Sequence, residues 1–409
     1  MDDALPLLVI YRTGPRKYRE YLLRSISSRY RIHMFVGVEP SWENDYISGH
    51  TLLGKNLDPE VATAAARDLH AREPISGMMC WDEARIAQTA FATDALGLPG
   101  PGAAAIGRCR DKHQTRAALA AAGVPQPRSI RVDSLDEATA AAAEIGYPVI
   151  LKPSDLVASK GVVRVDSPAD LPEHFAATHA VEGGIPGYQA RVLVEEYVPG
   201  DEISVDSVIH GGRVTVLVLA RKVISEPPWR IEMGHFVDAD DPLRTDPALL
   251  AILHDTHAAI GFDEGVTHTE IKLSPDGPKV IEVNGRLGGG LIPYLGLLAT
   301  GVDTGLAAAD AACGVAPSVE PDRTRSAGIR FFAVSEPATV ITSIGFDEAL
   351  LPPTIVEATV SATVGEVLSP PTYGNVSGRI AYAIAVADTP AECRAALDLA
   401  AKAFLLNAP

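Results

Sequence analysis

The feature that most constrains this sequence is a pair of short strands on either side of residues 274–277, which read Ser-Pro-Asp-Gly. Adjacent antiparallel strands can place Glu270 and Glu282 on one face, and the alternation of a strand adds Asn284 and Arg286 to that face. Two bare carboxylates repel each other unless a divalent cation lies between them. Carboxylate and amide oxygens suit Mg²⁺ that also binds substrate phosphates, and a guanidinium suits a phosphate or carboxylate. The hairpin therefore predicts a sheet that carries a metal and anion site.

Three other segments have the chemistry of a nucleotide site. Lys152 ends the apolar strand 149–151, a costly place for a charge unless an anion meets it, and Lys112 is a second lysine on another predicted element. The loop 154–161 has small polar residues whose backbone amides could close over phosphates. The strand 193–198 runs into carboxylates, so its backbone could bind an adenine edge and a carboxylate could accept ribose hydroxyls. Alone, each segment has an ordinary interpretation, as a solvated lysine, a loop or the acidic end of a hairpin.

Composition and charge limit the classes of protein that fit the chain. The 409 residues are 47% hydrophobic and 21% charged, which is typical of a globular protein of two to four domains. The excess of 52 Asp and Glu over 35 Lys and Arg, a formal charge of −17, argues against nucleic acid or an anionic membrane as a partner. No apolar stretch approaches the ~18 residues of a membrane span, and the acidic start does not fit a signal peptide. We therefore expect a cytoplasmic protein.

The order of predicted elements favours an α/β (α+β) fold with several parts. Residues 1–110 alternate short apolar strands with helices, which predicts a parallel sheet. Helices are expected after Asp111 and Ser134, which are favourable N-cap residues, and strands dominate residues 192–220. Further strands near the end of the chain precede a helix that Thr389 opens with capping-box spacing.

Taken in order, the charged residues of these segments resemble the ATP-grasp superfamily over roughly residues 1–310. The order is Lys112, Lys152, Glu195, Glu202, Glu270, Glu282, Asn284 and Arg286. Within it, residues 232–235 and 284–289 resemble the L-amino acid ligases, which join amino acids into dipeptides. The segment after residue 315 resembles the extra C-terminal lobe of these ligases.

The resemblance implies an ATP-grasp fold in four parts. These would be an N-terminal pre-ATP-grasp domain at residues 1–110, a small lobe with a phosphate lid loop at 111–192, a catalytic lobe at 193–312 and a C-terminal α+β lobe at 313–409. The sequence departs from the pattern in two places. Its lid loop has only Gly161 where many relatives are rich in glycine, and Asp238 stands where the ligases usually carry proline.

The resemblance also implies roles for individual residues. The groups expected at the ATP phosphates are Lys112, Lys152, Ser159 and Gly161. The groups expected at the nucleoside are Glu195, the backbone of Val198, and Glu202. The expected ligands of one or two Mg²⁺, with Mn²⁺ as an alternative, are Glu270, Glu282 and Asn284. The groups expected at the reacting acyl group are Arg286 and His235, and those expected around the substrate are Glu232, Trp229, Gly288 and Gly289.

Three of these side chains have open alternatives. Lys222 is either an extra phosphate contact or part of a structural salt bridge. Trp229 either walls a substrate pocket or is an ordinary core residue. His235 would donate to the oxyanion or orient the amine, and its alternative is a hydrogen-bonded histidine in a loop.

The expected reaction is the ATP-dependent joining of a carboxylate to an amine. ATP would phosphorylate the carboxylate, and the amine would attack the acylphosphate to form an amide or dipeptide, with release of ADP and phosphate. The partners would be small-molecule carboxylates and amines, with a homodimer through the Ala- and Leu-rich stretch 295–312 as a further expectation. The alternatives are an ATP-grasp carboxylase or purine-pathway ligase, and a degenerate nucleotide-binding protein that keeps the fold.

Overall fold

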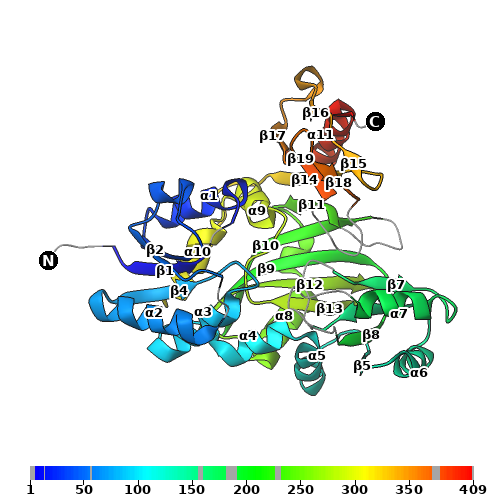
Figure 1. Cartoon of the computed structure of the whole chain (residues 1–409), viewed down its shortest axis with the longest axis horizontal. Helices are drawn as coiled ribbons and strands as arrows, with labels where there is room; N and C mark the ends of the chain where they lie inside the picture. The colour runs from blue at the N-terminus through cyan, green and yellow to red at the C-terminus, as the bar shows by residue number, and fades with distance from the viewer. Residues whose placement is uncertain are drawn as a thin grey trace.

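The computed structural model describes residues 5–12, 14–55, 58–154, 160–180, 191–225, 232–370 and 378–407. Two residues expected at the site, Ser159 and Trp229, lie outside the described residues. A long central sheet has an N-terminal α/β domain on one side, a small α/β lobe on the other and the C-terminal segment at one end (Figure 1). This arrangement confirms the expected mixed α/β architecture.

The N-terminal domain is a parallel sheet between helices, as the alternation of residues 1–110 predicts. Its elements are β1 (Leu7–Tyr11), α1 (Arg16–Ile26), β2 (Arg31–Val36), the 3-10 helix η1 (Trp42–Asp45), β3 (Gly49–Leu52), α2 (Pro59–Arg72), β4 (Ile75–Met79), α3 (Ile86–Leu96) and α4 (Gly102–Arg110). The strand order is β3-β2-β1-β4. Leu8 and Ile10 of β1 pack in the same core as α1, whereas Leu7 and Val9 pack with α2, because successive side chains of a strand point to opposite faces.

The small lobe is an antiparallel sheet with helices on one face. The chain enters it through α5 (Lys112–Ala121), and the lobe contains β5 (Ser129–Val132), α6 (Leu135–Ile145), β6 (Val149–Pro153), β7 (Val163–Val165), α7 (Leu171–His179) and β8 (Val192–Glu196). The strand order is β5-β8-β6-β7. The expected N-caps are confirmed, since Asp111 accepts hydrogen bonds at the start of α5 and Ser134 accepts one at the start of α6. Val149 and Leu151 pack with the helices, which leaves Lys152 on the opposite face.

The central sheet is antiparallel, and its described strands run in the order β13-β12-β9-β10-β11-β14-β19-β17. These strands are β9 (Asp201–His210), β10 (Arg213–Ile224), β11 (Glu232–Asp238), β12 (Gly265–Ser274), β13 (Gly277–Asn284), β14 (Ser326–Ala333), β17 (Ile355–Val360) and β19 (Arg379–Ala387). The predicted hairpin is β12–β13 at one edge, and Glu270 stands directly opposite Glu282. The expectation that these two carboxylates share a face is confirmed.

Helices fill the space around the central sheet. They are α8 (Pro247–Ile260), preceded by the 3-10 helix η2 (Pro242–Thr245), and α9 (Ile292–Thr300) followed by α10 (Thr304–Ala312). Helix α10 contacts α1 and β4 on one side and β9 and β12 on the other, so it lies between the N-terminal domain and the central sheet. Most residues of α9 and α10 are buried. The expected dimer face at 295–312 is therefore wrong, because these side chains belong to the core of one chain.

Among the described residues, no single helix is long and apolar enough to cross a membrane. Helices α9 and α10 together have the length and apolar composition of a membrane span, but the chain bends by 110° between them.

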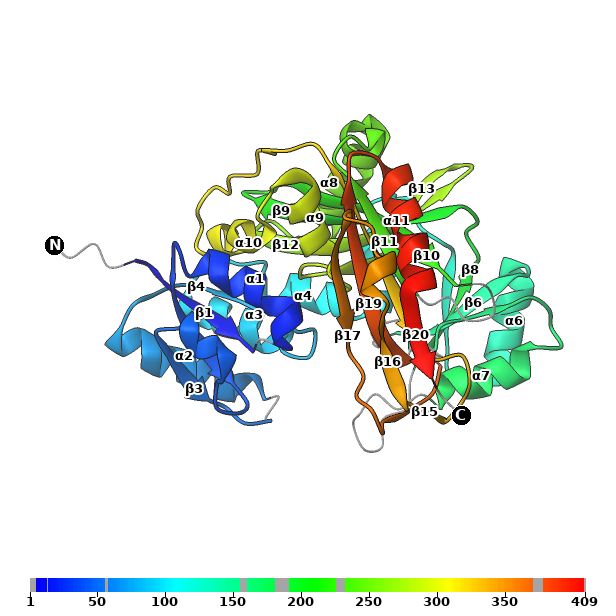
Figure 2. The same cartoon turned by 90° about the horizontal axis from the view of Figure 1, so that it is seen from above.

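The C-terminal segment is continuous with the central sheet. Strands β14, β19 and β17 extend that sheet beyond β11, and α11 (Pro390–Ala403) packs against β14 and β19 (Figure 2). Helix α11 begins with the predicted capping box between Thr389 and Glu392. The remaining elements are β15 (Thr339–Val340), β16 (Ser343–Phe346), the 3-10 helix η3 (Glu348–Leu350), β18 (Val367–Leu368) and β20 (Phe404–Asn407). The predicted boundary at residue 313 stays a prediction, since a shared sheet crosses it.

Candidate active site

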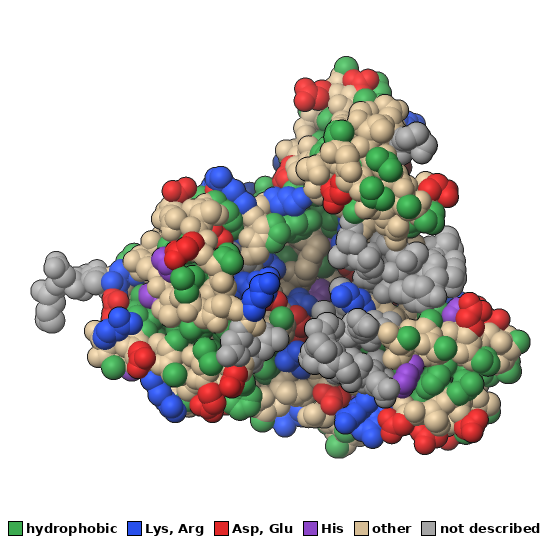
Figure 3. Space-filling model, viewed as in Figure 1, with side chains coloured by type: hydrophobic (Ala, Val, Ile, Leu, Met, Phe, Trp, Pro, Cys, Tyr) green, Lys and Arg blue, Asp and Glu red, His purple; other side chains and the backbone are tan. Residues whose placement is uncertain are grey.

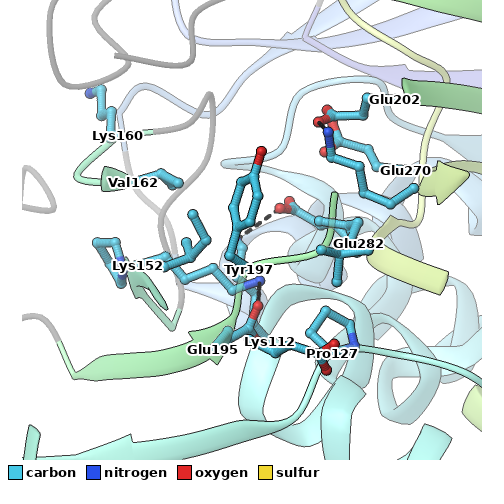
Figure 4. A pocket seen from close by; sticks show the side chains of 16 residues that line it. Lys112, Pro127, Lys152, Lys160, Val162, Glu195, Tyr197, Glu202, Glu270 and Glu282 are labelled. Atoms are coloured by element: carbon cyan, nitrogen blue, oxygen red, sulfur yellow. Dashed lines mark ion pairs between the residues drawn. The ribbon is translucent and has the colours of Figure 1, made fainter. Parts of the chain in front are cut away.

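A cleft between the small lobe and the central sheet brings together most of the residues expected at the nucleotide. The open space of this cleft, including the solvent at its mouth, is about 810 Å³. The space-filling view shows basic, acidic and histidine side chains in the hollow between the lobes (Figure 3). The charged groups that line the cleft are Lys112, Lys152, Lys160, Lys272, Glu195, Glu196, Glu202, Glu270 and Glu282. In the close view, Glu202, Glu270 and Glu282 lie on one side and Lys152 and Lys160 on the other (Figure 4).

Lys152 is held by a buried carboxylate. Its Nζ lies 2.6 Å from one oxygen of Glu195, and Arg116 Nε lies 2.8 Å from the other oxygen. Burial favours the neutral carboxyl, but the two cations outweigh it and hold the pKa of Glu195 at about 2. Burial lowers the pKa of Lys152 to about 8, with the nearby cations Arg116 and Lys112 adding to the effect and Glu195 opposing it. The carboxylate of Glu195 is thus engaged within the protein, and a contact to adenine would fall to the backbone of this strand.

Lys112 and Glu282 face each other across the cleft wall. Lys112 is the first residue of α5, and its Nζ lies 3.4 Å from Glu282 Oε2. Its backbone N–H donates to the carbonyl of Ser154, which ties α5 to the end of β6. The structure thus brings both expected phosphate lysines into one cleft with an expected metal ligand.

The expected metal ligands are two opposed carboxylates and a nearby amide. Glu270 and Glu282 pair across β12 and β13, and Asn284 is buried two residues further along β13, opposite His268. Within the described residues, no group of three or more His, Cys, Asp and Glu side chains is arranged to hold a metal. Two carboxylates and an amide are hard oxygen ligands, and Mg²⁺ usually completes its shell with phosphate oxygens and water. The residues present therefore fit Mg²⁺ bound together with a phosphorylated ligand.

Lys222 is surrounded by carboxylates. Its Nζ lies 2.7 Å from Glu270, 2.8 Å from Glu232 and 3.1 Å from Glu202, and its side chain is 1% exposed. Burial disfavours the charged amine, yet these three carboxylates raise the pKa of Lys222 well above its usual value. Of the two alternatives for this residue, the geometry supports the structural salt bridge. Lys222 therefore joins three carboxylates with different expected roles in one charged network. Glu202 is expected at the ribose, Glu232 at the substrate and Glu270 at the metal.

Arg286 lines a second cavity beside the nucleotide cleft. This cavity has an open space of about 910 Å³ between the N-terminal domain and the loop at residues 288–291. Arg286 Nε donates to Glu83 at 2.7 Å, and Glu83 lies in the loop after β4. Gly288 and Gly289, both expected near the substrate, line the same cavity. The structure thus places Arg286 in a different cavity from the lysines expected at the phosphates.

His235 is enclosed in the sheet. The residue lies on β11, its side chain is fully buried, and neither ring nitrogen has a hydrogen-bond partner. The alternative of a hydrogen-bonded loop histidine is therefore wrong. Burial lowers the pKa of His235 to about 4, although Glu232, 3.6 Å away, opposes the shift. A Cβ on Gly290 would lie 2.6 Å from His235 Nε2, so the glycine loop of the second cavity packs directly on the ring.

A second histidine lies between the expected metal ligand Glu270 and the glycine loop. His268 Nδ1 lies 2.6 Å from Asp206 Oδ1, and His268 Nε2 lies 3.7 Å from Glu270. Burial disfavours the imidazolium, but Asp206 and Glu270 raise the pKa of His268 to about 9. Asp206 also accepts a hydrogen bond from the backbone N–H of Gly288 at 3.0 Å. These contacts position the loop that forms one wall of the second cavity.

Comparison with known proteins identifies the domains of the chain. Residues 145–293 match the ATP-grasp domain, and residues 330–406 match the L-amino acid ligase C-terminal domain 2. The chain therefore contains an ATP-grasp domain followed by a C-terminal domain of the kind found in L-amino acid ligases. An uncharacterized protein of Sinorhizobium fredii is 28% identical over 417 residues, which cover 95% of this chain and 79% of that protein.

Two solved structures show the same fold over nearly the whole chain. The L-amino acid ligase from Bacillus licheniformis superposes with a TM-score of 0.80 at 23% identity, covering 99% of both chains. The phosphoribosylglycinamide synthetase from Anaerococcus prevotii superposes with a TM-score of 0.74 at 17% identity, covering 98% of this chain and 99% of that one.

The C-terminal ligase domain reaches the site of the ATP-grasp domain. Arg379 of β19 donates a hydrogen bond to the backbone carbonyl of Glu232, and its guanidinium lies 4.0 Å from the ring centroid of Phe331. The ring of Phe331 in turn meets His235 edge-on, with centroids 6.0 Å apart. The C-terminal domain thus contacts Glu232 through Arg379 and His235 through Phe331.

Sequence reasoning missed several groups of this ATP-grasp site. Lys272 lies two residues after Glu270 on the same strand, and the alternation of the strand could have revealed it. Arg116 lies one helical turn after Lys112, so their position on one face of the helix could also have been predicted. Glu83 carried no local signal, because it meets Arg286 across 203 residues of sequence.

The loop expected to close over the phosphates lies only partly within the described residues. Lys160 and Val162 line the cleft, and Gly161 between them has a φ of +72°, which favours glycine. The carbonyl of Gly161 accepts a hydrogen bond from Thr178 at 3.0 Å. Val198 also lines the cleft and is buried, and its expected place beside the adenine stays a prediction.

Proposed function

We propose that the protein joins the carboxylate of one amino acid to the amine of a second, with hydrolysis of ATP to ADP and phosphate. The observation that carries this proposal is the order of charges in the ATP-grasp domain. Phosphate-binding lysines face two opposed carboxylates in one cleft, and an arginine lies beyond them in a second cavity. The L-amino acid ligase C-terminal domain supports an amino acid as the carboxylate substrate.

ATP would occupy the cleft between the lobes. Lys112 and Lys152 would bind its phosphates from α5 and β6, and the backbone at Val198 would bind adenine. Glu202 would accept the ribose hydroxyls, since its carboxylate lines the cleft while Lys222 and Lys272 hold it from behind. The ion pairs of Lys152 with Glu195, and of Glu202 with Lys222 and Lys272, hold these side chains in position before ATP binds.

Glu270, Glu282 and Asn284 would hold one or two Mg²⁺. When bound, Mg²⁺ neutralises phosphate charge and orients the transferred phosphoryl group. Lys112 and Lys222, which pair with the two carboxylates, limit the negative charge that these strands carry before the ion binds.

The proposed reaction has two steps. A carboxylate oxygen of the first substrate attacks the terminal phosphorus of ATP, and the bond to ADP breaks to leave an acylphosphate. The amine nitrogen of the second substrate then attacks the acyl carbon, the bond to phosphate breaks, and the amine loses a proton. Arg286 would stabilise the negative charge of the acylphosphate and of the tetrahedral intermediate. Glu83 accepts a hydrogen bond from Arg286 Nε and the carbonyl of Leu287 accepts one from Nη1, so Nη2 is the nitrogen that would bind the substrate.

His235 would act as a neutral side chain. With its pKa lowered to about 4 by burial, the imidazole carries one N–H and no charge at neutral pH. Because Gly290 packs on its Nε2, the ring would position the glycine loop that lines the second cavity beside the reacting acyl group. We expect His235→Ala to lower kcat/KM by more than about tenfold, and a smaller loss would remove it from the mechanism.

A second candidate is a ligase of the purine-pathway type, which one observation favours. The synthetase from Anaerococcus prevotii has the same fold over 98% of this chain. Such a ligase would use the same ATP site with a nucleotide amine. It leaves the match of residues 330–406 to the L-amino acid ligase domain without an explanation.

The deciding experiment measures ADP and phosphate release with Mg-ATP across all pairs of proteinogenic amino acids, with products read by mass spectrometry. The proposal predicts a product one water lighter than its two amino acids and one ADP for each bond. Release of AMP and pyrophosphate would contradict the acylphosphate. Turnover only with phosphoribosylamine and glycine would favour the second candidate.

A further inference from the structure

The second cavity contains more positive than negative charge. It is lined by the cations Arg12, Arg19 and Arg286 and by the carboxylates Asp82 and Glu83. Arg12 pairs with Asp82 at 3.1 Å, and Arg286 pairs with Glu83 at 2.7 Å. Within the described part of the chain, Arg19 makes no hydrogen bond or ion pair. The cavity therefore has one cation that forms no ion pair with a described carboxylate of its wall.

Arg19 is held in place although it has no anionic partner. It lies on α1, which Leu22, Leu23 and Ile26 anchor in the core. Its guanidinium lies over the ring of Trp81, 5.3 Å from the centroid. Burial lowers the pKa of Arg19, and the neighbouring charge of Arg286 acts in the same direction. A cation that is partly removed from water and lacks a partner gains most from a bound anion.

The opposite wall leaves room for a substrate. A Cβ on Gly289 would have no atom within 4 Å, so this residue faces open space. Gly288 and Gly290 are instead packed against His268 and His235, which hold the loop. A ligand between Arg19 and Gly289 would therefore lie beside Arg286 and next to a fixed glycine backbone.

The two substrates of the proposed reaction differ in their carboxylates. The carboxylate of the first substrate becomes the acylphosphate, whereas an amino acid that supplies the amine keeps its carboxylate unchanged. This second carboxylate must leave water when the cavity binds it, so it needs a cation that is not already paired.

We propose that the second cavity binds the amine substrate and that Arg19 binds the free carboxylate of an amino-acid acceptor. Arg19 is then the residue that selects amino acids over other amines. This inference rests on the proposed function and adds the place and the recognition of its second substrate. From here the second cavity is called the acceptor pocket.

The test compares acceptors that differ only in the carboxylate. The rate of ADP formation is measured with saturating ATP and donor, using each acceptor amino acid and its carboxamide. Arg19→Met removes the charge and keeps most of the side-chain length. We expect it to lower kcat/KM for amino-acid acceptors by about 10- to 100-fold, the range for a hydrogen bond to a charged group, and to leave carboxamide acceptors nearly unchanged. Arg19→Lys keeps the charge and should keep the preference for amino acids.

The matched control is Arg16→Met. Arg16 lies one turn earlier on α1, and it pairs with Glu20 on the surface. Loss of Arg16 should leave kcat/KM unchanged for both amino-acid and carboxamide acceptors. An equal loss for amino acids and carboxamides in Arg19→Met, or a loss that appears in the KM of the donor, would overturn the proposal.

A binding measurement without turnover tests the acceptor pocket independently of the proposed reaction. Calorimetry with Mg-ADP present measures the affinity of proteinogenic amino acids and their carboxamides without turnover. Carboxylate-dependent binding that Arg19→Met abolishes supports the acceptor pocket even if no dipeptide forms. Equal affinity for both kinds of probe, or affinity for neither, overturns it. Failure of the proposed function is read separately, as the absence of ADP release with every pair of amino acids.

Discussion

The nucleotide cleft and the acceptor pocket differ in how their charges are arranged. In the cleft, cations and carboxylates meet in pairs, such as Lys152 with Glu195, Lys112 with Glu282 and Lys272 with Glu202. In the acceptor pocket, Arg19 stands among the described residues without a carboxylate partner. Most charged groups of the cleft lie on strands of two sheets, whereas those of the pocket lie on α1 and on loops.

This difference separates two tasks of one enzyme. Paired charges on strands keep their geometry before a ligand binds, which suits chemistry that is the same in every turnover. A single unpaired cation beside a glycine loop suits the choice of substrate, because loops on a rigid scaffold can change without disturbing the sheet. Four predictions test whether the two regions are as independent as this arrangement implies.

The largest effect is expected where a buried pair of the cleft is broken. Arg116→Met removes a guanidinium that binds both oxygens of Glu195 and two backbone carbonyls. The buried carboxylate is then left with Lys152 alone, so we expect the free energy of unfolding to fall by about 3–5 kcal/mol. Urea denaturation measures this change. Arg128→Met breaks the exposed pair with Glu144, and it should cost less than about 1 kcal/mol. Equal losses in the two variants would contradict the role of Arg116.

The next effect concerns turnover. Glu270→Gln removes a carboxylate charge from the proposed metal site, and we expect ADP formation to fall by about 10²- to 10³-fold. Steady-state kinetics with varied Mg²⁺ measures the loss. Glu264→Gln is the matched control, since Glu264 precedes the same strand and pairs with His210 away from the cleft. Full activity in Glu270→Gln would show that the metal assignment is wrong.

The third effect is a pH dependence of ATP binding. Lys152 has a pKa of about 8, lowered by burial from an ordinary value of 10.5, so it loses its proton as the pH rises through 8. Above that pH, the affinity for ATP should fall by up to about tenfold per pH unit, because the phosphates lose a cation. The same lowered pKa means that Lys152 contributes stability as the pH rises from 8 toward 10.5, so weaker binding there does not reflect unfolding through this group.

Calorimetric titration of ATP at several pH values measures this dependence. Lys152→Arg keeps its charge throughout the range and should flatten the profile. An unchanged slope in that variant would assign the pH dependence to another group.

The smallest effect is expected at the glycine loop of the acceptor pocket. Gly289→Leu places a side chain in open space, and we expect kcat/KM for amino-acid acceptors to fall by about three- to tenfold, most for large ones. Gly289→Ala should stay within about twofold. The KM for ATP should be unchanged in both variants if the two regions are independent. A parallel rise in the KM for ATP would show that the glycine loop also shapes the cleft.

Much of the fold and part of the site could be predicted from local patterns. The caps at Asp111, Ser134 and Thr389 are each decided by residues within one turn of helix. The pairing of Glu270 with Glu282 followed from the turn between two short strands. The apolar stretch 295–312 misled in one respect, because its composition is the same whether its faces meet a second chain or the core of its own.

The sequence by itself determined most of the strands and helices and several of the charged residues that line the cleft, because periodicity and capping act over a few residues. Only the tertiary structure decided how those charges are balanced. Arg116 meets Glu195 across 79 residues, and Arg286 meets Glu83 across 203 residues. Only the packing of distant elements removes such groups from water and assigns or withholds a partner, which is why the unpaired charge of Arg19 emerged only from the folded chain.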